Sequence, residues 1–194
     1  MNLVRFAASA ISAVAFATAV AALSCSPGAK PPAETTPAPA DPAARVERGK
    51  VIAVVSGCHD CHTPGLMYGA PDFTRALSGS EVGWLGPWGT SYARNLTPDP
   101  ETGLGRYTAE QIVAALKGGR RLDGGPMLPP MPWQNLASYS DEDLHALAVY
   151  LLSLPPVKHA VPDVVPPGKN PAGPVFTMPP PPPWDAPRQG ATAH

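Results

Sequence analysis

The sequence predicts one all-α domain of roughly 110 residues, built from three main helices and long loops. Three stretches carry apolar side chains at helical spacing, and no alternating run indicates a β-strand. Of the 28 prolines in 194 residues, 6 lie in residues 26–44 and 13 in residues 155–194, which leaves 9 in the stretch between. Because proline is unfavourable in helix interiors and central strands, we expect the folded domain to occupy residues 45–156.

The first 24 residues have the pattern of a secretory signal peptide. One positive charge in residues 1–5 precedes an Ala-rich run, residues 6–23, that carries no formal charge. Cleavage after Ala21 fits its small neighbours, whereas cleavage before Cys25 fits a sequence that resembles the box at which bacterial lipoproteins are lipidated. An uncleaved anchor is a third interpretation, although 18 residues make a short membrane span. All three place the domain outside the cytoplasm. Lipidation of Cys25 would tether it to the membrane in the periplasm.

Two Pro/Ala-rich arms flank the predicted domain. Residues 25–44 and residues 157–194 contain too few large apolar side chains to form a core. We expect the first arm to be a semi-rigid tether and the second to be a solvated, disordered tail. The tail also holds a proline run, residues 179–183, which is a candidate ligand for a partner protein.

The helices are predicted from their caps and their apolar stripes. The first occupies residues 45–56. The second starts after Thr108, which begins a capping-box pattern, and it ends at a Gly-Gly pair that includes Gly119. The third follows Ser140, has three acidic residues in its first turn, and ends before Pro155. Between the first two helices lies a long glycine-rich loop, and a loop of that length inside a compact domain usually wraps around something.

Residues 58–62 read Cys-His-Asp-Cys-His, which is the CxxCH pattern of haem c attachment. The spacing lets Cys58 and Cys61 reach the two vinyl groups of one porphyrin, with His62 beneath the iron. Alternatives are a redox CxxC, half a zinc site or a disulfide. A thioredoxin-like motif would follow a strand, and outside the motif the domain offers zinc only His145 and no further cysteine. Together with the export signal, the motif predicts one covalent haem c.

A sixth iron ligand must come from the opposite side of the porphyrin. Met127 and Met131 lie on a proline-rich strap, residues 124–133, directly before the last helix. Because prolines stiffen this strap, either thioether could be held at the iron with little loss of entropy. Methionine is also a common core residue. We interpret His59 as a solvated spacer and His145 as a surface residue.

From about residue 45 to residue 157 the chain resembles class I-type bacterial cytochrome c domains. The resemblance is strongest to the haem domains of cytochrome subunits that serve membrane-bound alcohol, aldehyde and gluconate dehydrogenases. It rests on CxxCH at residues 58–62, YARNLTPD at 92–99, PMPW at 130–133, and SDEDL at 140–144 leading to LPP at 154–156. Those subunits usually carry three CxxCH motifs, and this chain has one.

The resemblance implies the cytochrome c fold, in which the loops wrap around one covalently attached haem. It implies that the first and last helices cross, with Gly49 and Tyr150 in close contact. It also implies that Met131 is the axial ligand opposite His62, and that Asn95 and Thr97 lie near the haem edge.

The sequence therefore predicts a single-haem c-type cytochrome that carries one electron at a time. Its expected partners are redox proteins: a membrane-bound dehydrogenase, other cytochromes or a terminal oxidase. One alternative is a haem enzyme or gas sensor with an open sixth position, such as a small peroxidase; another is a structural module of a larger oxidoreductase. With 14 Lys and Arg against 15 Asp and Glu, the chain lacks the basic footprint of a nucleic-acid binder.

Overall fold

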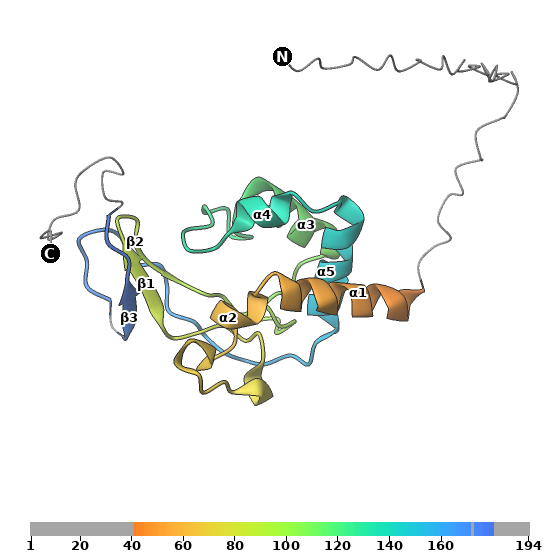
Figure 1. Cartoon of the computed structure of the whole chain (residues 1–194), viewed down its shortest axis with the longest axis horizontal. Helices are drawn as coiled ribbons and strands as arrows, with labels where there is room; N and C mark the ends of the chain where they lie inside the picture. Colours follow the sequence, from red (N-terminus) through yellow and green to blue (C-terminus); the bar gives the residue numbers. More distant parts are fainter. Residues whose placement is uncertain (1–40, 172, 181–194) are drawn as a thin grey trace, which may run out of the picture. The chain divides into compact units, whose positions relative to one another are not determined.

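The computed structural model describes residues 41–171 and 173–180 (Figure 1). The predicted signal peptide, Cys25, most of the predicted tether and residues 181–194 lie outside this range. The helices are α1 (Pro42–Val55), α2 (Cys58–His62), α3 (Ala109–Gly118), α4 (Trp133–Ala137) and α5 (Asp141–Ser153), with 3-10 turns η1 (Leu66–Tyr68) and η2 (Phe73–Arg75). The strands are β1 (Gly83–Gly86), β2 (Gly89–Tyr92) and β3 (Val175–Thr177). Within the described residues, no helix is both long and apolar enough to cross a membrane.

Helices α1 and α5 pack closely where they cross, at a glycine. A Cβ atom on Gly49 would collide with the carbonyl oxygen of Ala146 and would lie 2.7 Å from the Cβ of Tyr150. Any side chain at this position would therefore push the two helices apart. The predicted close contact between Gly49 and Tyr150 is confirmed. Behind this crossing, α3 and α5 bury a common core that includes Ile112, Leu116, Leu144 and Leu147.

The predicted caps of α3 and α5 are confirmed. The Thr108 hydroxyl accepts from the backbone N–H of Gln111, whose side chain accepts from the N–H of Thr108, and Gly119 ends α3 with φ of 62°. Ser140 accepts from the N–H of Asp143 at the start of α5. Helix α1 begins earlier than expected, because Asp41 caps it and a proline is tolerated in the first turn. Its first turn therefore overlaps the predicted tether.

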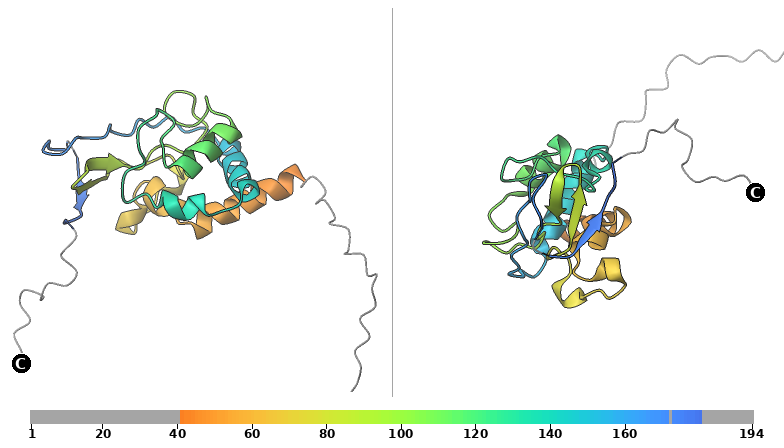
Figure 2. Two further views of the ribbon diagram at one scale, coloured as in Figure 1. Left: turned by 90° about the horizontal axis from the view of Figure 1, so that it is seen from above. Right: turned by 90° about the vertical axis from the view of Figure 1, so that its left-hand side faces the viewer.

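The expectation of a purely α-helical domain is wrong in one respect, since three short strands form a sheet in the order β2-β1-β3. Strand β1 pairs antiparallel with β2, with Gly83 opposite Tyr92, and parallel with β3, with Gly83 opposite Val175. Each strand has only three or four residues, and β1 has glycine at both ends, so no alternating pattern marks it in the sequence. The sheet lies at the opposite end of the described domain from the crossing of α1 and α5 (Figures 1 and 2).

The chain that follows α5 returns along the domain toward the sheet, as Figure 1 and the left view of Figure 2 show. We call residues 157–165 the C-terminal arm. At its start, Val157 bonds to the side chains of Asn95 and Thr97, and at its end Val165 pairs with Thr90. The expectation of a solvated tail from residue 157 onward does not hold for the arm or for β3. The folded part of the chain therefore continues past residue 156.

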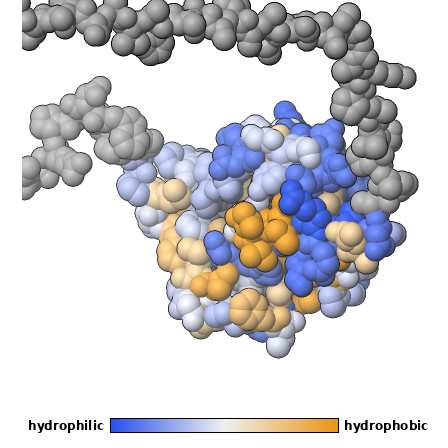
Figure 3. All heavy atoms as spheres, turned by 45° about the vertical axis from the view of Figure 1, so that its right-hand side comes forward, coloured by the Kyte–Doolittle hydropathy of each residue, from blue (hydrophilic) through white to orange (hydrophobic). Residues whose placement is uncertain are grey.

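Three valines on α1 are exposed, and Figure 3 shows a cluster of strongly apolar side chains on one face of the molecule. The exposed valines of α1 are Val51, Val54 and Val55. Helix α1 thus buries one side against α5 and presents apolar side chains to solvent as well.

Candidate functional site

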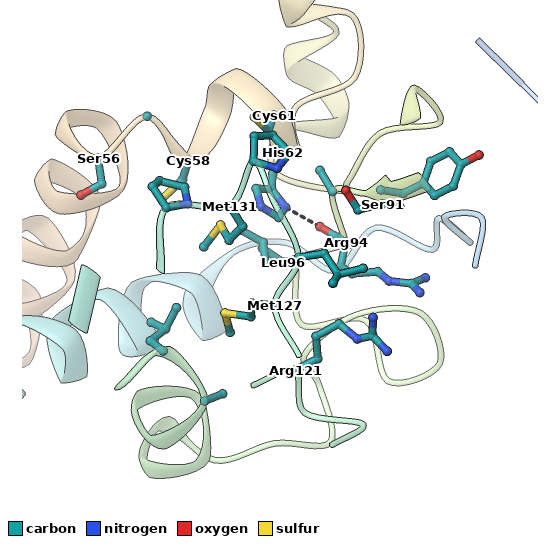
Figure 4. Close-up of a pocket in the computed structure, with 18 of the residues that line it drawn as sticks. Ser56, Cys58, Cys61, His62, Ser91, Arg94, Leu96, Arg121, Met127 and Met131 are labelled. Carbon is teal, nitrogen blue, oxygen red and sulfur yellow. Dashed lines mark hydrogen bonds between the residues drawn. The ribbon is translucent and has the colours of Figure 1, made fainter. Parts of the chain in front are cut away.

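The CxxCH motif forms the short helix α2, and its first turn depends on Gly57. Gly57 has φ of 67°, a left-handed conformation that glycine adopts without strain. Its carbonyl oxygen accepts from the N–H of Asp60 at 3.0 Å and so begins the helix. This turn places Cys58, Cys61 and His62 together on the wall of one cavity (Figure 4).

That cavity has a volume of about 400 Å³ and is predominantly apolar. Residues from α3, α5, the strap and other loops line it. The apolar lining includes Leu96, Leu104, Ile112, Leu116, Leu147 and Leu151. A large, flat, mostly apolar group attached at α2 would therefore be surrounded by protein and shielded from water.

The imidazole of His62 is oriented by a backbone carbonyl group. Its Nδ1 lies 2.6 Å from the carbonyl oxygen of Arg94. Because that oxygen can only accept, Nδ1 carries the proton, and Nε2 is left with the lone pair that a metal requires. Burial lowers the pKa of His62, and the hydrogen bond to Arg94 opposes this effect only in part. The lowered pKa favours the neutral ring, which is the form that binds iron.

The two thiols of the motif are free, and their burial favours the protonated form. Burial raises the pKa of Cys58 to about 11, and burial also raises the pKa of Cys61. A zinc site would need further donors, and no group of three or more His, Cys, Asp or Glu side chains that could hold a metal occurs in the described part of the chain. Two thiols and one neutral imidazole fit a thioether-linked haem better than a zinc ion.

The strap brings both candidate methionines to the cavity. The N–H of Met127 donates to the carbonyl of Gly119 at 2.8 Å, and that of Met131 donates to Leu128 at 3.2 Å. Both side chains line the cavity that Cys58 and Cys61 also line (Figure 4).

Asn95 and Thr97 are buried but do not line the cavity. The Asn95 amide donates to the carbonyl of Val157 at 2.7 Å, and its oxygen accepts from the N–H of Thr97 at 2.9 Å. The residues that reach the cavity are their neighbours, Arg94 and Leu96. Asn95 and Thr97 thus fasten the cavity wall to the C-terminal arm.

The other two histidines of the helical region lie outside the cavity lining. His59 Nδ1 lies 3.0 Å from the Thr63 hydroxyl, one turn along α2. His145 Nε2 lies 3.4 Å from a carboxylate oxygen of Glu110, near the surface. Neither ring is directed at the site.

Sequence reasoning did not find several residues of the site. The carbonyl of Arg94 carries no signal, because any residue supplies a carbonyl group. Arg121 lies just before the strap in the sequence. Its positive charge could have suggested that it binds an anionic group at the site. Trp84, Ser91 and Val164 line the cavity from the sheet and the arm, which were not predicted to fold against it.

The family model described as Cytochrome c matches residues 46–155. Over 124 residues, 62% of its length, the chain is 38% identical to "Alcohol dehydrogenase (quinone), cytochrome c subunit" from Gluconobacter oxydans (strain 621H), of which it covers 24%. It is 34% identical over 109 residues, 56% of its length, to "Gluconate 2-dehydrogenase cytochrome c subunit" from Pantoea cypripedii, of which it covers 23%.

A third relative is "Diheme cytochrome c-type" from Cereibacter sphaeroides, which is 31% identical over 117 residues, 58% of this chain and 37% of that protein. The chain thus spans about a quarter of the two dehydrogenase subunits and about a third of the dihaem protein. The match begins within α1 and extends through α5, and it includes the CxxCH helix, the cavity wall and the strap. The chain therefore belongs to the cytochrome c family.

Proposed function

We propose that the chain carries one haem c, bound through thioethers to Cys58 and Cys61, with His62 as the proximal ligand. The hydrogen bond from His62 Nδ1 to the Arg94 carbonyl carries this proposal, because it leaves the Nε2 lone pair available in a residue that lines the same cavity as the two free thiols. Each S–H would add across a vinyl C=C bond, so that a C–S bond and a C–H bond form and no atom is lost. The guanidinium of Arg121, at the cavity, suits a carboxylate of the haem.

Met131 is the proposed sixth ligand. It stands between Pro130 and Pro132, and all three residues line the cavity. The same Pro-Met-Pro sequence supports the resemblance to the dehydrogenase cytochrome subunits. Met127 lines the cavity as well, so a direct comparison of the two methionines decides the assignment.

The protein acts as a one-electron carrier. Haem iron accepts and gives up one electron when both axial positions are filled. From residue 121 to residue 132, the cavity lining is apolar apart from Arg121, and it holds no acid and no histidine. An enzyme or sensor would need an open position and, for peroxide chemistry, an acid–base group on this side. The protein's own contribution is to hold both ligands and to exclude water.

The proposed partners are a membrane-bound dehydrogenase and other cytochromes or a terminal oxidase, in the periplasm. The names of the relatives support this, since several are cytochrome subunits of dehydrogenases. Between residues 45 and 154 the chain has nine Lys and Arg against eleven Asp and Glu. A surface so nearly balanced exerts little long-range steering, which suits brief encounters with partners.

Cys25 is the proposed lipid anchor, and it lies outside the described residues. If it is lipidated, Cys25→Ser moves the protein from the membrane to the soluble fraction and leaves its absorption spectrum unchanged. An equal distribution of the two forms would instead favour cleavage after Ala21.

Carbon monoxide distinguishes a carrier from an enzyme or sensor. We expect the reduced protein to be low-spin, to bind carbon monoxide slowly and to exchange electrons quickly with a second cytochrome. Stopped-flow absorption measures all three properties on the full-length exported protein. Rapid carbon monoxide binding at neutral pH, or hydrogen peroxide turnover that Met131→Ala does not increase, would favour the enzyme or sensor.

A further inference from the structure

The C-terminal arm is hydrogen-bonded to residues 90–97, a segment that contributes one wall of the cavity. At one end, the N–H groups of Thr90 and Val165 each donate to the other's carbonyl, at 2.8 and 3.0 Å. At the other end, the N–H of Val157 donates to the Thr97 hydroxyl at 3.1 Å. The arm thus supports this wall along its whole length.

Arg94 joins the arm to the proximal histidine. Its carbonyl oxygen accepts from His62, and its guanidinium donates to the carbonyl oxygens of Val161 and Pro162 at 3.3 and 3.2 Å. The guanidinium also lies 3.5 Å from a carboxylate oxygen of Asp163. The backbone and the side chain of one residue therefore connect the arm to His62.

The arm is fixed a second time at His159, whose side chain is only 13% exposed. One ring nitrogen lies 2.9 Å from the carbonyl oxygen of Ser78, and the other lies 2.9 Å from a carboxylate oxygen of Glu81. The neighbouring Gly79 donates its N–H to the carbonyl of His62 at 2.8 Å. Its Cα is so close to Val161 that a Cβ would lie 2.5 Å from Cγ2 of that valine. The arm thus bonds to Arg94 and packs against Gly79, and each of these two residues has a backbone group that is hydrogen-bonded to His62.

We propose that the C-terminal arm is a positioning element of the haem site, which acts through Arg94 on the orientation of His62. The proposal rests on the proposed function, in which His62 binds iron. A hydrogen bond from the second ring nitrogen fixes the orientation of a ligating imidazole and raises its basicity. If the arm is released, the Arg94 carbonyl gains freedom and this hydrogen bond weakens. Val164 of the arm also lines the cavity, so that release would admit water there.

The test is the hydrogen-exchange rate of the His62 Nδ1–H, measured by NMR in the reduced, full-length protein. Arg94→Met keeps the carbonyl group but removes the side-chain donors to the arm. We expect the Nδ1–H of His62 to exchange about tenfold faster in this variant, because hydrogen bonds to charged groups contribute roughly 1.5 kcal/mol or more. Arg94→Lys, which keeps a cationic donor, should restore slow exchange in part. Lys158→Met is the matched control, because it removes a cation of the arm whose partner is the exposed Glu101. It should leave the rate within twofold.

A second variant keeps the proposal testable if Arg94→Met does not fold. His159→Phe removes the other attachment of the arm without changing Arg94, and it should accelerate exchange and raise the reduction potential, because a less basic imidazole stabilises ferric iron less. The double variant should exchange no faster than Arg94→Met alone, since both substitutions release the same element. If folded Arg94→Met or folded His159→Phe exchanges the His62 Nδ1–H as slowly as the unaltered protein does, the proposal is wrong. Absence of covalent haem from the unaltered protein would overturn the proposed function instead, and the absorption spectrum detects this first.

Discussion

The hydroxyl group of Ser91 donates a hydrogen bond of 2.5 Å to the carbonyl oxygen of Pro129. Ser91 belongs to β2, and Pro129 lies on the strap between the two candidate methionine ligands. The sheet, although small, thus holds the strap against the cavity. Ser91 precedes Pro129 by 38 positions in the sequence.

Removal of this link should let the strap open more often. A neutral hydrogen bond contributes about 1 kcal/mol, so Ser91→Ala should raise the population of the open strap about fivefold. Stopped-flow binding of carbon monoxide to the reduced protein measures this population, because carbon monoxide enters only when the sixth position is free. Ser138→Ala is the control, since this exposed hydroxyl donates only within its own helical turn, to Gln134 at 3.2 Å. Equal rates in Ser91→Ala and the unaltered protein would show that the sheet does not hold the strap.

The two methionines of the strap differ in what their removal should do. Met131→Ala should abolish the weak sulfur-to-iron absorption band of the ferric protein and lower the reduction potential, because the thioether stabilises ferrous iron. Met127→Ala should leave the band in place and should reduce stability only through the loss of packing contacts. Visible absorption and potentiometric titration of both variants give the answer. Loss of the band in Met127→Ala alone would move the ligand to that residue.

Gly49→Ala should destabilise the protein, although alanine is the better helix former. The added methyl group would meet the backbone of α5, which cannot move without separating the helices. Overpacking of this kind costs about 1–3 kcal/mol and outweighs a helix-propensity gain of about 1 kcal/mol. Gly118→Ala in α3 is the matched control, because nothing lies within 4 Å of a Cβ there. Denaturant unfolding should show a loss of stability for the first substitution and none for the second.

Much of the helical framework follows from the sequence, because caps and apolar stripes are local signals. Thr108 and Gly119 bound α3 as predicted, and the CxxCH motif brings Cys58, Cys61 and His62 to one wall. The sheet and the arm could not be found in this way. Trp84 lies in a strand of four residues that is stabilised by pairing with chain segments on either side of it.

The arm lacks a large apolar stripe and is held by polar contacts instead. Asn95 and Thr97 bond to the backbone of Val157, and Arg94 bonds to carbonyl groups further along. Composition predicts whether a segment can form a core, but it does not predict that distant side chains will bind the backbone of that segment. Composition also fails to predict two contacts that position the site, the Arg94 carbonyl bonded to His62 and the Ser91 hydroxyl bonded to Pro129.

Asp99 should make stability depend on acid pH. Its carboxylate accepts from the hydroxyl and the N–H of Thr102, both at 2.7 Å, and these hydrogen bonds, the hydroxyl first, lower the pKa of Asp99. A lowered pKa in the folded protein stabilises it above the unfolded value of about 3.9, and this contribution disappears as the pH falls through the folded value. Asp99→Asn should therefore lose less unfolding free energy than the unaltered protein between about pH 5 and about pH 2.

Covalent attachment is tested by removal of the thiols singly and together. If Cys58 and Cys61 each form a thioether, haem should stay with the polypeptide through acid–acetone extraction in either single Cys→Ala variant, since one bond is sufficient to retain it. Each single variant should also show a red-shifted absorption band in the reduced state, because one vinyl group remains conjugated with the porphyrin. The double variant should release its haem completely.

His59→Ala is the control within the motif, since its ring contacts Thr63 and lies outside the cavity lining, and it should retain haem with an unshifted band. Haem that resists extraction in the double variant would mean that the group is attached at some other residue.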